Sequence, residues 1–314
     1  MGKGMRCTIP PRIRWAANWM STHSRPSFAV VLGAGLLCLL AGIRPAAHSQ
    51  TVHPVTLKPA AATAPDIPFH EYESQTEQDL LHMANQARER VGAPNLKLDS
   101  GLTAAARTHA QAMLEARQLS HQFTGEPALI RRLAATSTLQ LDQAGENVAL
   151  DYSAAGGHEH LMLSPPHRAN LLNPAYNVVG LGVVRSGDRL YIVQDFGHAL
   201  PAYSDEQVKD RVAAAVNQMR HDAGRPKLSR HDLMNADVSA CSMAKADKLG
   251  TSSVRKLARN STVLTYTSLH PESLPAEASH AIRSPNLHTF SVGACYSRTE
   301  TYPTGVHWIV LILD

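Results

Sequence analysis

Three side chains that can do chemistry lie beside turn-forming residues in the middle of the chain: His121, Glu146 and His167. Two imidazoles and a carboxylate that converge can bind a divalent metal, because histidine nitrogen and carboxylate oxygen are common metal ligands. The same groups can also transfer protons. Spacing along the chain does not show convergence, and a single histidine is more often a surface or core residue than a ligand.

The segment that must position these residues predicts an α+β fold, because its helices come first and its strands last. Helices would cover a mostly antiparallel sheet. His121 and Glu146 fall in predicted loops, the second of them at Gly145-Glu146-Asn147-Val148-Ala149. Apolar periodicity and capping residues predict helices at about 73–91, 100–117, 126–135 and 157–163, and a hairpin of strands at 178–185 and 190–196.

The N-terminus has the pattern of a secretory signal. Basic residues without an acid precede an apolar run from Phe28 to Ile43, and small residues favour cleavage near Ser49. We therefore predict a signal peptide at 1–49 and an exported protein, which would be secreted, periplasmic or at the cell surface. The alternative is an uncleaved anchor, since roughly 16 apolar residues approach the lower limit for spanning a membrane. Only in that case would the chain contact a membrane, through this segment.

Composition is that of an ordinary globular protein. The 314 residues carry a net charge of +4, much of it in the signal region. No basic block indicates nucleic-acid binding. No Gly-x-Ser-x-Gly elbow, phosphate-binding glycine loop or dinucleotide fingerprint is present, so a serine hydrolase, a kinase and a dehydrogenase have no local support.

Two cysteines, Cys241 and Cys295, would remain after cleavage, because Cys7 and Cys38 lie in the signal region. Two cysteines in an oxidising compartment can pair, so we predict a Cys241–Cys295 disulfide. The alternative is two free buried thiols.

The chain divides at two points. Residues 50–70 are rich in Pro and Ala and predict an extended linker before a domain at 71–200. Residues 204–314 predict a degenerate second copy of the same fold, without the loops of His121, Glu146 and His167. Chance similarity is the alternative. The matches are Asn85–Leu96 with Asn217–Leu228, Val178–Val183 with Ser291–Tyr296, and Tyr191–Gln194 with Trp308–Leu311.

Several short motifs of the first copy follow one another in a recognisable order. They are Asn85-x-x-Arg88, Gly92-x-Pro94-x-Leu96, His109, Ser120-His121, Gly145-Glu146-Asn147, Ser164-Pro165-Pro166-His167-Arg168-x-Asn170, Val179-Gly180-Leu181-Gly182 and Gln194-Asp195-Phe196-Gly197. With these motifs, residues from about 73 to 197 resemble the bacterial branch of the CAP superfamily, the cysteine-rich secretory, antigen 5 and pathogenesis-related-1 proteins.

The resemblance implies an α-β-α sandwich, an extracellular role and a cleft that can hold a divalent metal, foremost zinc. His121 and His167 match the cleft histidines of the family, and Glu146 matches the acid of its Gly-Glu-Asn motif. Many relatives have a second acid after an aromatic residue, but here Leu161 and Ser164 stand in those places. We therefore expect a three-membered cluster. The residues expected to fix its loops are Asn147, Arg168, Asn170 and Ser164, together with Arg132, while His109 is expected to be packed or hydrogen-bonded.

Two functional hypotheses follow. The first, which we favour, is a non-enzymatic extracellular binding module for a lipid, polysaccharide or protein. The second is a metal-assisted hydrolase acting on peptides or cell-wall material, in which Glu146 would orient or deprotonate a water. The sequence has no obvious strong nucleophile and leaves the ligand unidentified.

Overall fold

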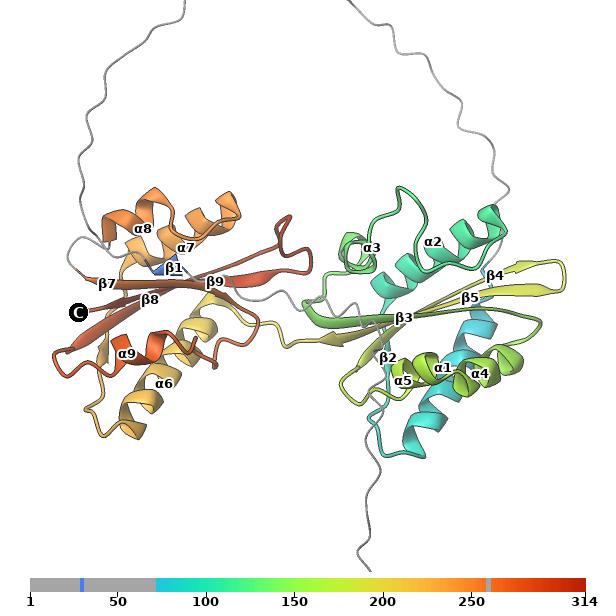
Figure 1. Cartoon of the computed structure of the whole chain (residues 1–314), viewed down its shortest axis with the longest axis horizontal. Helices are drawn as coiled ribbons and strands as arrows, with labels where there is room; N and C mark the ends of the chain where they lie inside the picture. Colours follow the sequence, from blue (N-terminus) through green and yellow to red (C-terminus); the bar gives the residue numbers. More distant parts are fainter. Residues whose placement is uncertain (1–28, 31–71, 258–260) are drawn as a thin grey trace, which may run out of the picture.

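A computed structural model describes residues 29–30, 72–257 and 261–314 (Figure 1). The predicted linker and, except for Ala29 and Val30, the predicted signal peptide lie outside these residues. Two units are formed, which we name the first unit (residues 72–200) and the second unit (residues 201–314). Within the described part of the chain, no helix combines the length and apolar character needed to cross a membrane.

The first unit is built on a four-stranded sheet with the order β2-β4-β5-β3. Its strands are β2 (Lys97–Leu98), β3 (Leu141–Asp151), β4 (Val178–Ser186) and β5 (Arg189–Ala199). β5 pairs antiparallel with both β3 and β4, whereas β2 pairs parallel with β4. The residues predicted as a loop around Glu146 are instead the centre of β3. Glu146 and Asn147 pair with Asp195 and Gln194 of β5. The turn-like composition of this segment does not indicate such pairing.

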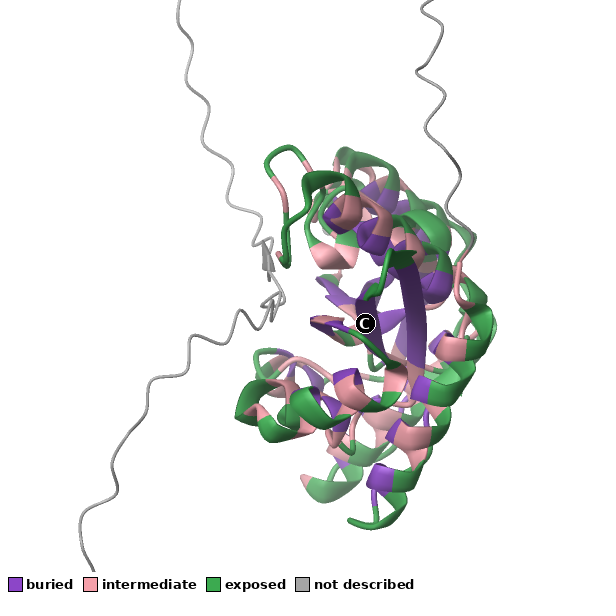
Figure 2. Cartoon of the chain, turned by 90° about the vertical axis from the view of Figure 1, so that its right-hand side faces the viewer, coloured by how far each residue is buried: buried purple, intermediate pink, exposed green. Residues whose placement is uncertain are grey.

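Helices cover both faces of this sheet (Figure 1). On one face, α2 (Ser100–Ala116) packs with Ala106, Ala110 and Met113 against the strands, and α3 (Leu129–Thr136) packs with Leu133. On the other face lie α1 (Ser74–Glu89), α4 (Ala154–Leu163) and α5 (Pro165–Leu171). The fold is therefore the predicted α-β-α sandwich. Figure 2 shows the buried residues concentrated in the strands between the helical layers.

Local sequence explains the boundaries of α2 and its close contact with the sheet. The Asp99 carboxylate accepts a hydrogen bond from the backbone N–H of Leu102 at 2.8 Å, which satisfies one free donor of the first turn. Gly180 on β4 lies directly against the backbone of Leu102, where a Cβ atom would overlap it. The helix therefore approaches the strand more closely than side chains would permit.

The second unit has the corresponding strand order β6-β8-β9-β7, and β1 (Ala29–Val30) pairs antiparallel with β7. Its other strands are β6 (Ser229–Arg230), β7 (Thr262–Ser268), β8 (Thr289–Ser297) and β9 (Val306–Leu313). The helices α7 (Met234–Ala246) and α8 (Ser252–Leu257) lie on one face, and α6 (Asp205–Asp222) and α9 (Ala278–Ile282) on the other (Figure 1).

Matching hydrogen bonds align the two units residue by residue. Asn85 bonds both backbone groups of Leu96, and Asn217 bonds those of Leu228 in the same way. Buried Arg88 and Arg220 each donate to backbone carbonyls of a distant segment. Their acceptors are Pro94, Leu171, Asn173 and Tyr176 for Arg88, and Pro226, Ile282 and Ser284 for Arg220.

The strand registers extend this alignment and correct one part of the sequence comparison. Leu98 pairs with Val179, and Arg230 pairs with Phe290, so Val179 corresponds to Phe290. The sequence comparison had paired Val179 with Val292 instead, which is wrong by two positions. Since side chains in a strand alternate with a period of two, such a shift preserves the apolar pattern and escapes notice.

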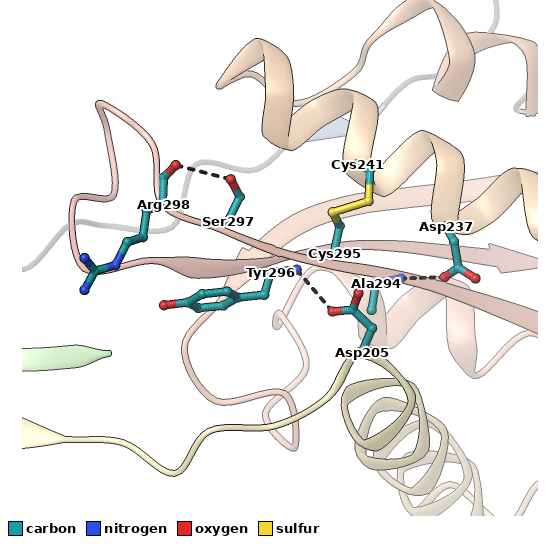
Figure 3. The surroundings of a disulfide bond; sticks show 8 residues. All are labelled: Asp205, Asp237, Cys241, Ala294, Cys295, Tyr296, Ser297 and Arg298. Atoms are coloured by element: carbon teal, nitrogen blue, oxygen red, sulfur yellow. Dashed lines mark hydrogen bonds between the residues drawn. A yellow bond between two sulfur atoms is a disulfide. The ribbon is translucent and has the colours of Figure 1, made fainter. Parts of the chain in front are cut away.

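The predicted disulfide between Cys241 on α7 and Cys295 on β8 is present (Figure 3). It joins a helix to the sheet across 54 residues of sequence. The bond lies beside the cluster of buried apolar residues under α7 and α8, where Cys295 is partly buried.

Candidate functional site

Glu146 is the centre of the polar cluster in the first unit. Its side chain is 4% exposed on β3. One carboxylate oxygen, Oε1, lies 2.9 Å from Nδ1 of His121, and the other, Oε2, accepts a hydrogen bond from Nη2 of Arg132. Both oxygens of this buried carboxylate are therefore engaged by cationic or hydrogen-bonding groups, as burial of a charge requires.

His121 and His167 come together from different elements. His121 lies in the segment between α2 and α3, and its side chain is 58% exposed. His167 lies on α5, with its ring centroid 6.4 Å from that of His121 and the two planes tilted by 39°. Burial lowers the pKa of His167, and the neighbouring His121 lowers it further. The neutral ring, which is the metal-binding form, is therefore favoured at His167.

Amide side chains hold the backbone around His167. Nδ2 of Asn147 donates to the His167 carbonyl at 3.0 Å and to Oε1 of Gln194 at 3.2 Å. Nδ2 of Asn170 donates to the Glu146 carbonyl and to Oδ1 of Asn147. The Ser164 carbonyl accepts a bond from the backbone of Arg168, whose exposed side chain has no hydrogen-bond partner among the described residues.

Arg132 and His109 connect Glu146 to a second acid, Glu126. Nη1 of Arg132 lies 3.1 Å from Oε1 of Glu126, and Nδ1 of His109 lies 2.6 Å from the same oxygen. Burial disfavours the charged form of Glu126, but the backbone N–H of Phe123 and these two partners keep its pKa below the ordinary value. Arg132 thus joins two carboxylates, and it also donates to the His121 carbonyl.

Asp195 lies beneath this network, directly opposite Glu146 in the sheet. It is fully buried, and neither carboxylate oxygen has a hydrogen-bond donor among the described residues. Burial raises the pKa of Asp195 well above its ordinary value, and the charge of Glu146 raises it further, against the opposing effect of Arg132. The protonated, neutral form of Asp195 is therefore favoured.

The sequence that forms this cluster matches one known family. Residues 81–196 match the sequence profile of the Cysteine-rich secretory protein family, CAP. Residues 81–196 therefore form a CAP domain.

Relatives of the CAP domain occur in bacteria. The chain is 30% identical over 141 residues to the uncharacterised membrane protein YlbC of Bacillus subtilis, covering 45% of this chain and 39% of that protein. It is 30% identical over 117 residues to the uncharacterised protein YkwD of the same organism, covering 36% of this chain and 44% of that protein. The chain thus spans less than half the length of either relative.

Among solved structures, an extracellular protein containing an SCP domain from Bacillus anthracis is similar to this chain. The two are 26% identical, with a TM-score of 0.36, over 40% of this chain and 41% of that one.

His121 and His167 are the side chains of the CAP domain that could hold a cation. Contact of Nδ1 of His121 with Glu146 leaves Nε2 as the ring nitrogen for a ligand. A ring separation of 6.4 Å is near the upper limit for two imidazoles on one ion, given metal–nitrogen bonds of about 2.0–2.1 Å. Both carboxylate oxygens of Glu146 are engaged, so Glu146 would orient His121 and would not itself be a metal ligand. Among the described residues, no three His, Cys, Asp or Glu side chains are already arranged around a common metal position.

Sequence reasoning did not single out Asp195 or Glu126. Asp195 was named only within the Gln194-Asp195-Phe196-Gly197 motif, although a signal for it was available: it is the one acid in the mostly apolar strand Leu190–Phe196. Glu126 gave no such signal, since it lies in a polar loop. Leu161 and Ser164 stand in the places of the family's aromatic residue and second acid. Leu161 is buried in the core, and Ser164 lies at the junction of α4 and α5.

Proposed function

We propose that this chain is an exported binding protein whose CAP domain holds a divalent cation, foremost zinc, between His121 and His167. The meeting of these two rings from separate elements carries the proposal. Export is supported by the N-terminal signal pattern and by the disulfide, a bond that persists in oxidising compartments.

The contacts of Glu146 favour binding over hydrolysis. A general base for water needs a carboxylate oxygen that is free to accept a proton, but Oε1 and Oε2 of Glu146 are engaged by His121 and Arg132. The cation would then shape a surface for an extracellular lipid, polysaccharide or protein.

Zinc titration of the purified chain, starting at Gln50, tests the proposal. We expect one zinc ion per chain, and a loss of affinity of more than about tenfold in His121→Ala and in His167→Ala. His221→Ala is the matched control, because this exposed histidine lies on α6 of the second unit. Equal zinc binding by His121→Ala, His167→Ala and the unmodified chain would refute the site. Zinc-dependent cleavage of peptides or cell-wall material by the unmodified chain would favour the hydrolase instead.

A further inference from the structure

The loop between β8 and β9, residues 298–305, makes several of the contacts of the second unit with the first. Nη1 of Arg298 donates to the carbonyl of Ala134 at 2.8 Å. Nη2 donates to the carbonyls of Ser137 at 2.7 Å and Leu139 at 3.2 Å. A single guanidinium of the second unit thus binds three carbonyls at the end of α3 and just beyond it.

These carbonyls need an external partner. The last four carbonyls of a helix receive no hydrogen bond from within it. Because α3 has only eight residues, these carbonyls make up half of the helix. A cation at this end also interacts favourably with the helix dipole. Neither the C-cap residue Ser137 nor its neighbours supply a cation in the last turn of α3. Arg298 therefore supplies from the second unit the cap that α3 itself lacks.

The same short helix carries Arg132, which organises the site. Arg132 lies on α3 only two positions before Ala134, and its guanidinium binds Glu146, Glu126 and the His121 carbonyl. A chain of direct contacts therefore runs from the second unit through α3 to His121. The step from Ala134 to Arg132 follows the backbone of α3, and the other steps are hydrogen bonds or ion pairs that are at least partly buried.

We propose that Arg298 is a positioning residue for the site of the first unit. By fixing the end of α3, it keeps Arg132 on Glu146, and Glu146 in turn keeps His121 oriented. The second unit, which has no such cluster of its own at the corresponding strand positions, thereby completes the site of the first. This inference builds on the site of the proposed function, but it does not depend on zinc being the ligand.

Another contact between the units, outside this loop, provides a matched control. Nε2 of His270 lies 3.2 Å from Oδ2 of Asp142, at the start of β3. This contact crosses the same interface without touching α3. His270→Ala therefore removes an interface contact of the second unit while leaving the cap on α3 in place.

The test compares Arg298→Ala, Arg298→Lys and His270→Ala in the metal-free protein. Amide hydrogen exchange in α3 and NMR signals of the Arg132 guanidinium and His121 ring are measured. Arg298→Ala should raise exchange in α3 at least tenfold and shift both sets of signals. Arg298→Lys should show the same changes in weaker form, because an ammonium still binds carbonyls but reaches fewer of the three at once. His270→Ala should change neither measurement.

Two results would overturn the proposal: unchanged α3 exchange and Arg132 signals in Arg298→Ala, or the same changes in His270→Ala. If Arg298→Ala does not fold, Arg298→Lys decides, since it must show the same changes in weaker form. Zinc titration of the same variants separates this inference from the proposed function. Absence of zinc binding in the unmodified chain would refute the cation site and leave the positioning role to be judged on the metal-free signals.

Discussion

The two units share a sheet order, but they differ in the chemistry at its centre. In the first unit, Glu146 lies opposite Asp195. Following the aligned registers, the corresponding pair in the second unit is Val263 opposite Ile312. All four side chains are buried. The same fold therefore forms with either acids or aliphatic residues at this place.

The comparison indicates that the acids serve the site and not the fold. Burying a charge is unfavourable unless it is paired, and replacing buried ion pairs by apolar residues is often neutral or stabilising. The second unit shows the apolar solution. The first unit retains Glu146 and Asp195 and needs Arg132, His109 and Glu126 around them.

Removal of Arg132 should be the most damaging test of this difference. Arg132→Met leaves Glu146 and Glu126 buried without their shared cation, and we expect a loss of about 3–5 kcal/mol in the free energy of unfolding. Urea denaturation measures it. The control is Arg230→Met in the second unit, which removes ion pairs to exposed acids and should cost about 1 kcal/mol or less. Equal losses in the two variants would show that the first unit does not depend on its buried charges.

Asp195 predicts a pH dependence that Ile312 cannot have. The folded-state pKa of Asp195 is raised, so its stabilising contribution is fully present below the unfolded pKa and is lost as pH rises through the folded pKa. Asp195→Asn keeps a hydrogen-bond donor beside Glu146 but does not titrate. Its free energy of unfolding should therefore fall less with rising pH, by about 1.4 kcal/mol for each unit of raised pKa.

Urea denaturation between pH 4 and pH 8 (about the range in which buried carboxyls titrate) compares the two proteins. Parallel curves of stability against pH would mean that Asp195 is already charged in the folded state. Ile312→Val in the second unit serves as the control, since it removes a methylene without changing any titrating group.

The sequence predicted the elements whose signals are local. Helix α1 ends before Gly92, and α2 begins after the Asp99 cap, as expected. The Cys241–Cys295 disulfide also formed as predicted. These features depend on capping residues, apolar periodicity and cysteine number, all of which can be read within a short stretch or from composition.

The site was harder to predict because its partners are distant in sequence. Gly145-Glu146-Asn147 has the composition of a turn, and only the pairing with β5 makes it part of a strand. No local pattern indicated that Arg298 would cap α3, the helix that carries Arg132. Arg298 is 161 and 164 residues away from its acceptors Ser137 and Ala134. Such contacts arise from packing between elements and units, which local patterns do not encode.

The smallest effect on stability is expected where both polar partners are replaced together. Asn147 lies opposite Gln194, and the corresponding residues of the second unit are Leu264 and Leu311. Replacing both members of a buried hydrogen-bonded pair by apolar groups can be nearly neutral. The His167 carbonyl and the Asn170 amide also lose Asn147, but both are only partly buried and can bond water instead. Asn147→Leu with Gln194→Leu should therefore change the free energy of unfolding by about 1 kcal/mol or less, as judged by urea denaturation.

The same double variant should nevertheless impair the site, because the His167 carbonyl loses the donor that holds it. We expect zinc affinity to fall by about 10-fold, the lower end of the effect of removing a residue that supports a metal ligand. The single variant Gln194→Leu, which leaves the bond from Asn147 to His167 in place, is the matched control. If the double variant binds zinc as the control does, then Asn147 belongs to the scaffold that the two units share. If the double variant binds zinc more weakly with little change in stability, then the polar residues of the first sheet support the ligand site. The aliphatic residues at the same places in the second sheet would then support the fold alone.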